Sequence, residues 1–278
     1  MHTTRAGDER PIGMFDSGFG GLTVARAVID LLPAEHLVYF GDTGRYPYGS
    51  RPLSEVADFA HQIGELLVER FGIKLLIVAC NTAAAAALHE LAEACPVPVV
   101  GVIEPGVRSL LQATRNGQVG VIGTVGTIGS GAYQVAVDRL APTPPPAVQL
   151  ACAACPGFVE FVERGQTEGD EATVLAERLL APIVEAKVDT LLLGCTHYPY
   201  LARVIADVVG RDVVLVSSAD ETAFEVRALL EGSVLARDPG AGPGRHRFLS
   251  SGDVATFQAL GRRLLGPELD QVEAHQWR

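Results

Sequence analysis

Residues 74–82 read KLLIVACNT, and residues 189–197 read DTLLLGCTH. Each stretch is a short apolar run followed by a cysteine and two polar residues, and the two cysteines lie 115 positions apart. A second pair of similar runs, IGMFDSG at 12–18 and VGVIGT at 119–124, recurs at an offset of 107. Apolar runs without polar alternation are typical of parallel strands that helices cover on both faces. The repeats therefore predict two similar α/β halves, each with a cysteine where one strand ends.

Longer segments with helical periodicity alternate with such strands along the chain. We predict strands at 12–15, 37–40, 75–79, 97–103, 119–122, 191–193, 213–216 and 247–250, and helices at 22–32, 56–70, 82–94, 128–140, 170–186, 201–209, 221–235 and 254–265. Residues 141–147 and 238–244, rich in proline and glycine, read as a connector and a loop. The predicted fold is α/β, with two doubly wound parallel-sheet domains related by pseudo-twofold symmetry. Ligands bind at the carboxyl ends of parallel strands, so we expect the active site in the cleft between the domains.

The composition excludes several classes of protein. With 278 residues, 48% hydrophobic and 20% charged, the chain can bury a large core and is not disordered. Its net charge of −11 argues against non-specific binding to nucleic acid. We find no signal peptide and no apolar run long enough to span a membrane. Five cysteines, an odd and sparse set, indicate free thiols in a reducing cytoplasm.

Cys80 and Cys195 are the cysteines most suited to chemistry. Each follows a strand and precedes a helix, where backbone N–H groups and the helix dipole favour a thiolate. Cys95 reads as a structural residue. Cys152 and Cys155 have the spacing of a zinc or redox pair, but a matching second pair is absent from the sequence, so we expect burial and no metal site.

The glycine-rich residues 16–23 also follow a strand and open a helix, which suits anion binding by backbone amides. They match neither the dinucleotide-binding pattern nor the P-loop, so a small carboxylate is favoured over a nucleotide.

The chain resembles the glutamate racemases of the cofactor-independent aspartate/glutamate racemase superfamily. The matching motifs are FDSG at 15–18, GDTGRYPYG at 41–49, ACNTA at 79–83, residues 119–127, LGCTHYP at 193–199 and FLSSGD at 248–253. The resemblance implies interconversion of L- and D-glutamate without a cofactor, which supplies D-glutamate for peptidoglycan. It also implies interleaved domains, one formed by 11–103 plus 217–278 and the other by 104–216.

The resemblance also assigns roles to individual residues. Cys80 and Cys195 match the two acid/base thiols, with Asp16 as partner of the first and His197 as partner of the second. The auxiliary glutamate matches Glu163 rather than Glu160. The substrate-contacting positions are Asp16, Ser17, Tyr48, Gly49, Asn81, Thr82, Thr196 and His197. Two opposed thiols suit racemisation because one must be ionised while the other is protonated, and hydroxyl and amide donors, here Ser17, Asn81, Thr82 and Thr196, would stabilise the charge on the substrate carboxylate.

Other interpretations stay open at this stage. Taken singly, Asp16, Ser17 and Thr196 could be helix caps, Tyr48 a turn residue and His197 a core residue. Related racemases or isomerases that act on aspartate, a hydantoin or maleate share the two-cysteine scaffold. A function of another class is binding to DNA gyrase, which some glutamate racemases inhibit, and a homodimer is a further expectation. A pyridoxal cofactor is disfavoured because the only lysines, Lys74 and Lys187, do not follow strands.

Overall fold

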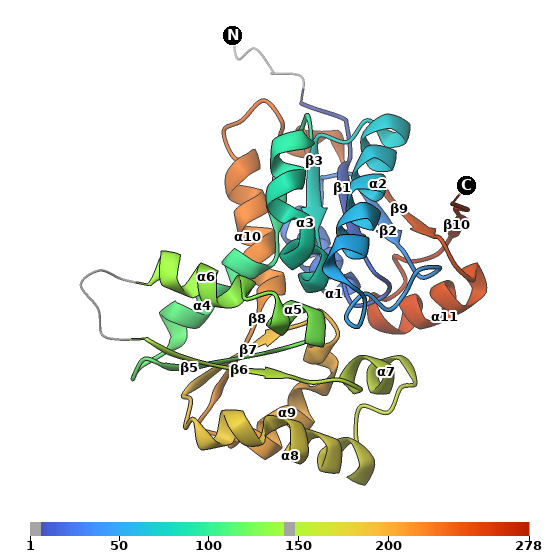
Figure 1. Cartoon of the computed structure of the whole chain (residues 1–278). Coiled ribbons are helices and arrows are strands. Elements are labelled where there is room, and N and C mark those ends of the chain that lie inside the picture. The colour runs from blue at the N-terminus through green and yellow to red at the C-terminus, as the bar shows by residue number, and fades with distance from the viewer. Residues whose placement is uncertain (1–6, 142–147, 278) are drawn as a thin grey trace.

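Two parallel β-sheets form the framework of the computed structural model, which describes residues 7–141 and 148–277 (Figure 1). The larger sheet has the order β10-β9-β2-β1-β3-β4 and the smaller one the order β6-β5-β7-β8. The strands are β1 Ile12–Asp16, β2 Leu37–Gly41, β3 Leu75–Val78, β4 Val99–Gly101, β5 Gln118–Gly123, β6 Gln149–Ala154, β7 Thr190–Gly194, β8 Val214–Ser217, β9 His246–Ser250 and β10 Val272–Ala274. Every pairing is parallel.

The two sheets repeat one topology. The order β2-β1-β3-β4 in the larger sheet corresponds to β6-β5-β7-β8 in the smaller one. The repeat with the cysteines supplies β3 and β7, and the repeat at 12–18 and 119–124 supplies β1 and β5, so equivalent strands hold equivalent central places. Strands β1, β3 and β7 are buried along their whole length, as apolar strands covered on both faces should be. The predicted α/β fold with two similar parallel sheets is confirmed.

Helices cover both sheets. They are α1 Leu22–Leu31, α2 Leu53–Phe71, α3 Asn81–Ala94, α4 Ile103–Ala113, α5 Val125–Gly129, α6 Ala132–Leu140, α7 Phe158–Glu163, α8 Asp170–Glu185, α9 Ala202–Val209, α10 Ser218–Leu230 and α11 Val254–Leu264, with short 3-10 helices η1 Tyr198–Leu201 and η2 Pro239–Ala241. Helices α2 and α3 pack together in front of the larger sheet in Figure 1, and α8 packs with α9 below the smaller one. Helix α4 contacts both the smaller sheet and α10.

Some elements differ from the sequence-based expectation. The predicted helix 128–140 is two helices, α5 and α6, because Gly131 has φ +73° and turns the chain between them. Helix α4, strand β6 and strand β10 were not predicted. Of the predicted connector 141–147, residues 142–147 lie outside the described residues. None of the described helices combines the length and the apolar character needed to cross a bilayer.

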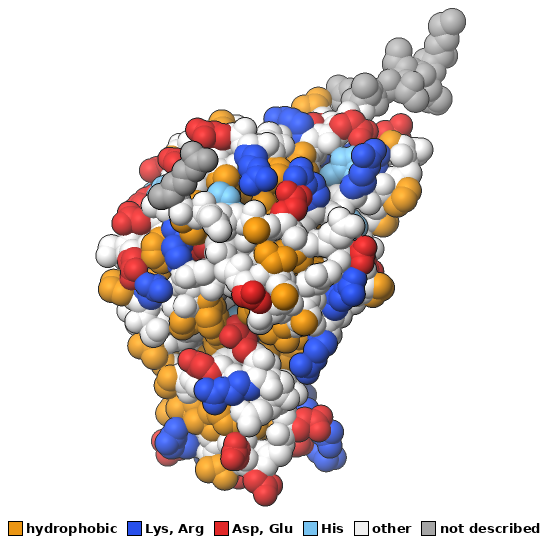
Figure 2. Space-filling view, turned by 90° about the vertical axis from the view of Figure 1, so that its right-hand side faces the viewer, with side chains coloured by type: hydrophobic (Ala, Val, Ile, Leu, Met, Phe, Trp, Pro, Cys, Tyr) orange, Lys and Arg blue, Asp and Glu red, His pale blue; other side chains and the backbone are white. Residues whose placement is uncertain are grey.

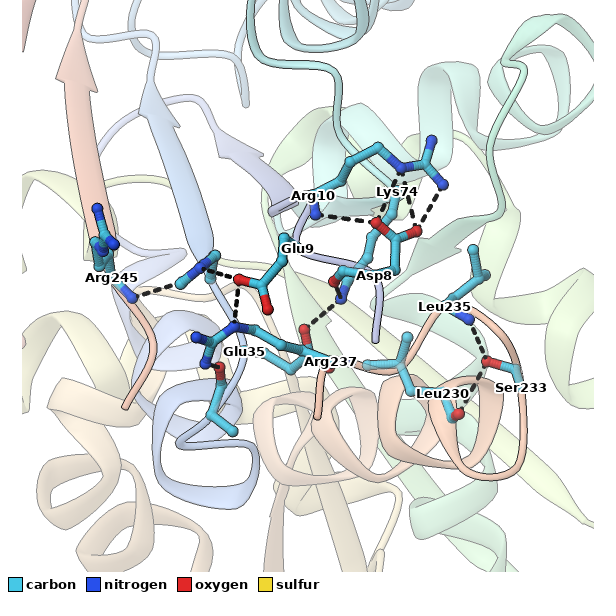
Figure 3. Close-up of polar contacts among 12 residues, drawn as sticks. Asp8, Glu9, Arg10, Glu35, Lys74, Leu230, Ser233, Leu235, Arg237 and Arg245 are labelled. Atoms are coloured by element: carbon cyan, nitrogen blue, oxygen red, sulfur yellow. Dashed lines mark hydrogen bonds and ion pairs between the residues drawn. The ribbon is translucent and has the colours of Figure 1, made fainter. Parts of the chain in front are cut away.

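A buried ionic cluster lies where β3 begins, at the opposite end of the strand from Cys80 (Figure 3). The Lys74 side chain is fully buried, with Nζ 2.5 Å from Glu35 Oε2. It also donates to the backbone oxygen of Asp8 at 2.9 Å. Glu35 accepts from the backbone N–H of Arg237 at 2.8 Å. The cluster therefore joins the beginning of the described chain to the segment that follows α10.

Candidate active site

The carboxyl ends of β1, β3, β5, β6 and β7 meet at one cavity, which both Cys80 and Cys195 line. The other lining residues are Asp16, Ser17, Tyr46, Pro47, Tyr48, Gly49, Ser50, Asn81, Thr82, Thr124, Val125, Cys155, Pro156, Gly157, Val159, Glu160, Thr196 and His197. They come from both sheets, so the cavity lies between the two halves, as predicted. Glu163 is the one predicted site residue that is not among the lining residues. Neither lysine of the chain lines the cavity.

Cys80 is held in its protonated form. It follows β3 at the start of α3 and is 5% exposed. Burial and the nearby Asp16 charge together hold the pKa of Cys80 well above its usual value. The backbone N–H groups of Ser17 and Ala83 and the Ser17 hydroxyl act in the opposite direction, because they favour the thiolate. Cys80 therefore carries its proton at neutral pH.

Asp16 combines the capping role and the site role that the sequence left open. Its Oδ2 accepts hydrogen bonds from the backbone N–H groups of Gly18 and Gly21, both at 3.1 Å, at the start of α1. Its Oδ1 is buried and has no hydrogen-bond partner within 7–141 and 148–277. Burial raises the pKa of Asp16, although the charge of His197 and the two N–H groups lower it.

Cys195 has a different neighbour. Its Sγ lies 3.9 Å from Nδ1 of His197, and Nε2 of the same ring lies 3.2 Å from Oε1 of Glu163. Burial opposes the charged imidazolium, but the interactions with Cys195 and Glu163 outweigh it and raise the pKa of His197 to about 10. At neutral pH His197 is therefore positively charged and faces the Cys195 sulfur. Glu163 contacts His197 but does not line the cavity, whereas Glu160 lines it.

Asn81 contacts a residue of the other half of the molecule. Its amide nitrogen donates to the Tyr133 hydroxyl at 2.7 Å, while its carbonyl oxygen is buried with no partner in the described part of the chain. Asn81 lines the cavity and also carries this acceptor, while the expectation that its amide donates to substrate stays a prediction. The Thr82 hydroxyl is 3.0 Å from that of Thr124 and 3.1 Å from that of Thr127. These three threonines link α3 to the turn after β5, so they also join the two halves.

Two glycines allow the walls to approach closely. The Gly49 oxygen accepts from the backbone N–H of Gly126 at 2.9 Å, and a Cβ at Gly49 would lie 2.7 Å from the Thr124 Cβ. A Cβ at Gly20 would lie 2.4 Å from both His197 Nδ1 and Thr196 Oγ1. Gly49 is therefore a contact between the halves, and Gly20 leaves the space that His197 fills.

Several lining residues were missed from the sequence. Thr124 follows β5 as Ser17 follows β1, and at the offset of 107 the two residues align, so the repeat could have marked Thr124. Tyr46 lies in the GDTGRYPYG motif, with its ring centroid 6.4 Å from that of His197. Cys155 was expected to be buried; it is buried and also lines the cavity beside Cys195, while Cys152 lies in β6. All five cysteines are free thiols.

Comparisons with known proteins find relatives that share the sequence and the fold over most of the chain. A family model described as Asp/Glu/Hydantoin racemase matches residues 13–225. A glutamate racemase from Acidothermus cellulolyticus is 53% identical over 262 residues, which cover 94% of this chain and 97% of that protein. Among solved structures, a glutamate racemase from Bacillus anthracis has a TM-score of 0.89 and 40% identity, with 98% of each chain covered. A glutamate racemase from Francisella tularensis, solved with D-glutamate, has a TM-score of 0.87 and 33% identity, with 97% of this chain and 98% of that chain covered.

Proposed function

Because this chain belongs to the Asp/Glu/hydantoin racemase family, we propose that it interconverts L-glutamate and D-glutamate and so supplies D-glutamate for peptidoglycan. The observation that carries the proposal is that Cys80 and Cys195, which follow strands of different sheets, line one cavity. The 53% identity to a glutamate racemase over nearly the whole chain supports glutamate as the substrate.

The mechanism follows from the unlike surroundings of the two thiols. A thiolate on Cys195, facing the positively charged His197, takes the Cα proton from one face of the substrate and leaves a carbanion. The protonated Cys80 then gives its proton to the opposite face of that carbon. In the reverse direction the two sulfurs exchange roles. We propose that the hydroxyls of Ser17 and Thr196, which line the cavity, donate to the substrate carboxylate, while Asn81 accepts from the ammonium group.

Single removal of each thiol tests this proposal. We expect Cys80→Ala and Cys195→Ala each to lower racemisation by about 10²- to 10⁴-fold, because a proton can then be moved on only one face. In D2O each variant should still exchange the Cα proton of one enantiomer, and the two variants should differ in which enantiomer that is. Proton NMR of both enantiomers measures this. Cys95→Ala, which removes a half-buried thiol outside the cavity, is the control. Full racemisation in either site variant would contradict the two-thiol mechanism.

Aspartate is the alternative substrate, since the two-thiol arrangement does not itself fix the length of the side chain. The same exchange experiment with D-aspartate separates the two substrates: exchange of D-aspartate at the rate of D-glutamate would contradict a preference for glutamate.

The remaining expectations also stay proposals. We propose the domain boundaries 11–103 plus 217–278 and 104–216, a reaction without a cofactor, and a cytoplasmic location, which the five free thiols support. The homodimer and the inhibition of DNA gyrase that the resemblance implies stay predictions. On the face shown in Figure 2, basic side chains are interspersed with acidic ones rather than gathered into a patch.

A further inference from the structure

We infer that Trp277, near the end of the chain, is a positioning residue for the cavity wall formed by residues 46–50. The inference rests on the proposed function for what that wall binds. These five residues all line the cavity and lie between β2 and α2, outside any helix or strand. A wall of this kind needs contacts with other parts of the molecule to keep its shape.

The loop is held first by Asp42, which directly follows β2 and is fully buried. Its Oδ2 accepts from Nε of Arg45 at 2.7 Å and from the Tyr48 hydroxyl. A buried carboxylate is stable only when its oxygens are paired, so these bonds fix the loop at two points. Tyr48 in turn lines the cavity.

The other oxygen of the Asp42 carboxylate accepts hydrogen bonds from two residues late in the chain. Asp42 Oδ1 accepts from Nε1 of Trp277 at 2.9 Å and from the Ser251 hydroxyl at 2.6 Å. The Trp277 ring also lies 3.9 Å from the guanidinium carbon of Arg45. One tryptophan therefore contacts both members of the Asp42–Arg45 ion pair and sets the direction in which the carboxylate faces.

The path of the chain brings Trp277 to this place. Strand β10 pairs with β9 at the edge of the larger sheet, and the backbone N–H of His275 then donates to Ser250 at 2.8 Å (Figure 1). The ring of Trp277 next packs edge-on against Phe40, with centroids 5.5 Å apart. Trp277 does not line the cavity, so its effect on substrate has to pass through Asp42.

Two substitutions separate its two contacts. Trp277→Phe keeps an aromatic ring for Arg45 and Phe40 but removes the N–H donor, while Trp277→Ala removes both. The matched control is Phe224→Ala, which removes an exposed aromatic ring that lies 5.2 Å from the Arg227 guanidinium and does not line the cavity.

We expect Trp277→Phe to raise KM about fivefold in both directions and to change kcat less than about twofold, because the loosened wall binds substrate less well. Ser251→Ala, which removes the other donor to Oδ1, should give the same signature. In the double variant Trp277→Phe/Ser251→Ala, KM should rise by more than the product of the two single increases, since both donors bind one oxygen. Unchanged KM in both Trp277 variants would overturn the inference.

A second measurement does not depend on activity. Amide hydrogen exchange of residues 43–50 should be faster in Trp277→Ala than in the wild type and unchanged in Phe224→Ala. Equal exchange in all three proteins would overturn the inference. A wild-type protein without glutamate racemisation would contradict the proposed function instead, and the exchange measurement would still decide the role of Trp277.

Discussion

Glu163 controls the charge of His197 without lining the cavity. Its carboxylate stabilises the imidazolium through the 3.2 Å contact with Nε2. Glu160 offers the same side chain from the same short helix, but it faces the cavity. Substitution of Glu163 and of Glu160, one at a time, therefore distinguishes the effect of a charge that contacts His197 from the effect of a charge that lines the cavity.

We expect Glu163→Gln to lower the pKa of His197 from about 10, because the neutral amide no longer stabilises the positive ring. The alkaline limb of the pH profile of kcat/KM should then move to lower pH. Steady-state racemisation measured from pH 6 to pH 11 checks this, with Glu160→Gln as the control. Equal profiles for the wild type and Glu163→Gln would contradict the role of Glu163.

The raised pKa of His197 also makes the free energy of unfolding depend on pH. The folded pKa of His197 lies above its ordinary value of 6.5, so its contribution is fully present below about pH 6.5 and is lost as pH rises through about 10. In Glu163→Gln the free energy of unfolding should therefore depend less on pH between these values.

Gly20 is needed because His197 occupies the space beside it. In Gly20→Ala the new methyl group would meet His197 Nδ1 and Thr196 Oγ1, which are both buried. We expect a loss of about 1–3 kcal/mol in the free energy of unfolding. Racemase activity should fall by about 10²-fold, since His197 is displaced from Cys195. Gly129→Ala is the control, because nothing lies within 4 Å of a Cβ at that position. Thermal unfolding and activity assays compare the two, and similar behaviour of both variants would contradict this explanation.

Among the elements, those with strong apolar runs were predicted well. The runs at 12–15, 37–40 and 75–79 are strands within one residue of the predicted bounds, because a buried central strand needs an unbroken apolar sequence. Strand β6 was missed, since its sequence QLACAA has small residues and no β-branched residue. Helix α4 was missed as well, because Pro105 and Gly106 stand inside it. Its first turn tolerates them, and both are buried.

The site was predicted less completely than the elements. The repeated cysteines could be found from the sequence because they directly follow two equivalent strands. The contacts of Tyr46 and Trp277 could not, since their positions depend on segments far apart in the chain. The contact of Asn81 with Tyr133 could not be predicted for the same reason, because Tyr133 belongs to the other half of the molecule.

The buried pair of Lys74 and Glu35 stabilises the molecule as a whole, because its cluster joins the beginning of the described chain to the segment after α10. Lys74→Met leaves the Glu35 charge buried and should lower the free energy of unfolding by about 3–5 kcal/mol. The double variant Lys74→Met/Glu35→Leu should be less destabilised. Urea unfolding measures both, with Lys187→Met, at an exposed position, as the control. A double variant as unstable as the single one would contradict the pairing.

The unlike neighbours of the two sulfurs have a further consequence for the catalytic cycle. On the proposed mechanism, a completed reaction leaves Cys195 carrying a hydrogen and Cys80 without one, the reverse of the arrangement before substrate arrived. The empty protein therefore exists as two isomers that differ only in where that hydrogen sits, and each accepts one mirror image of the amino acid. Before the protein can repeat the same conversion, it has to return from one isomer to the other by exchange with water.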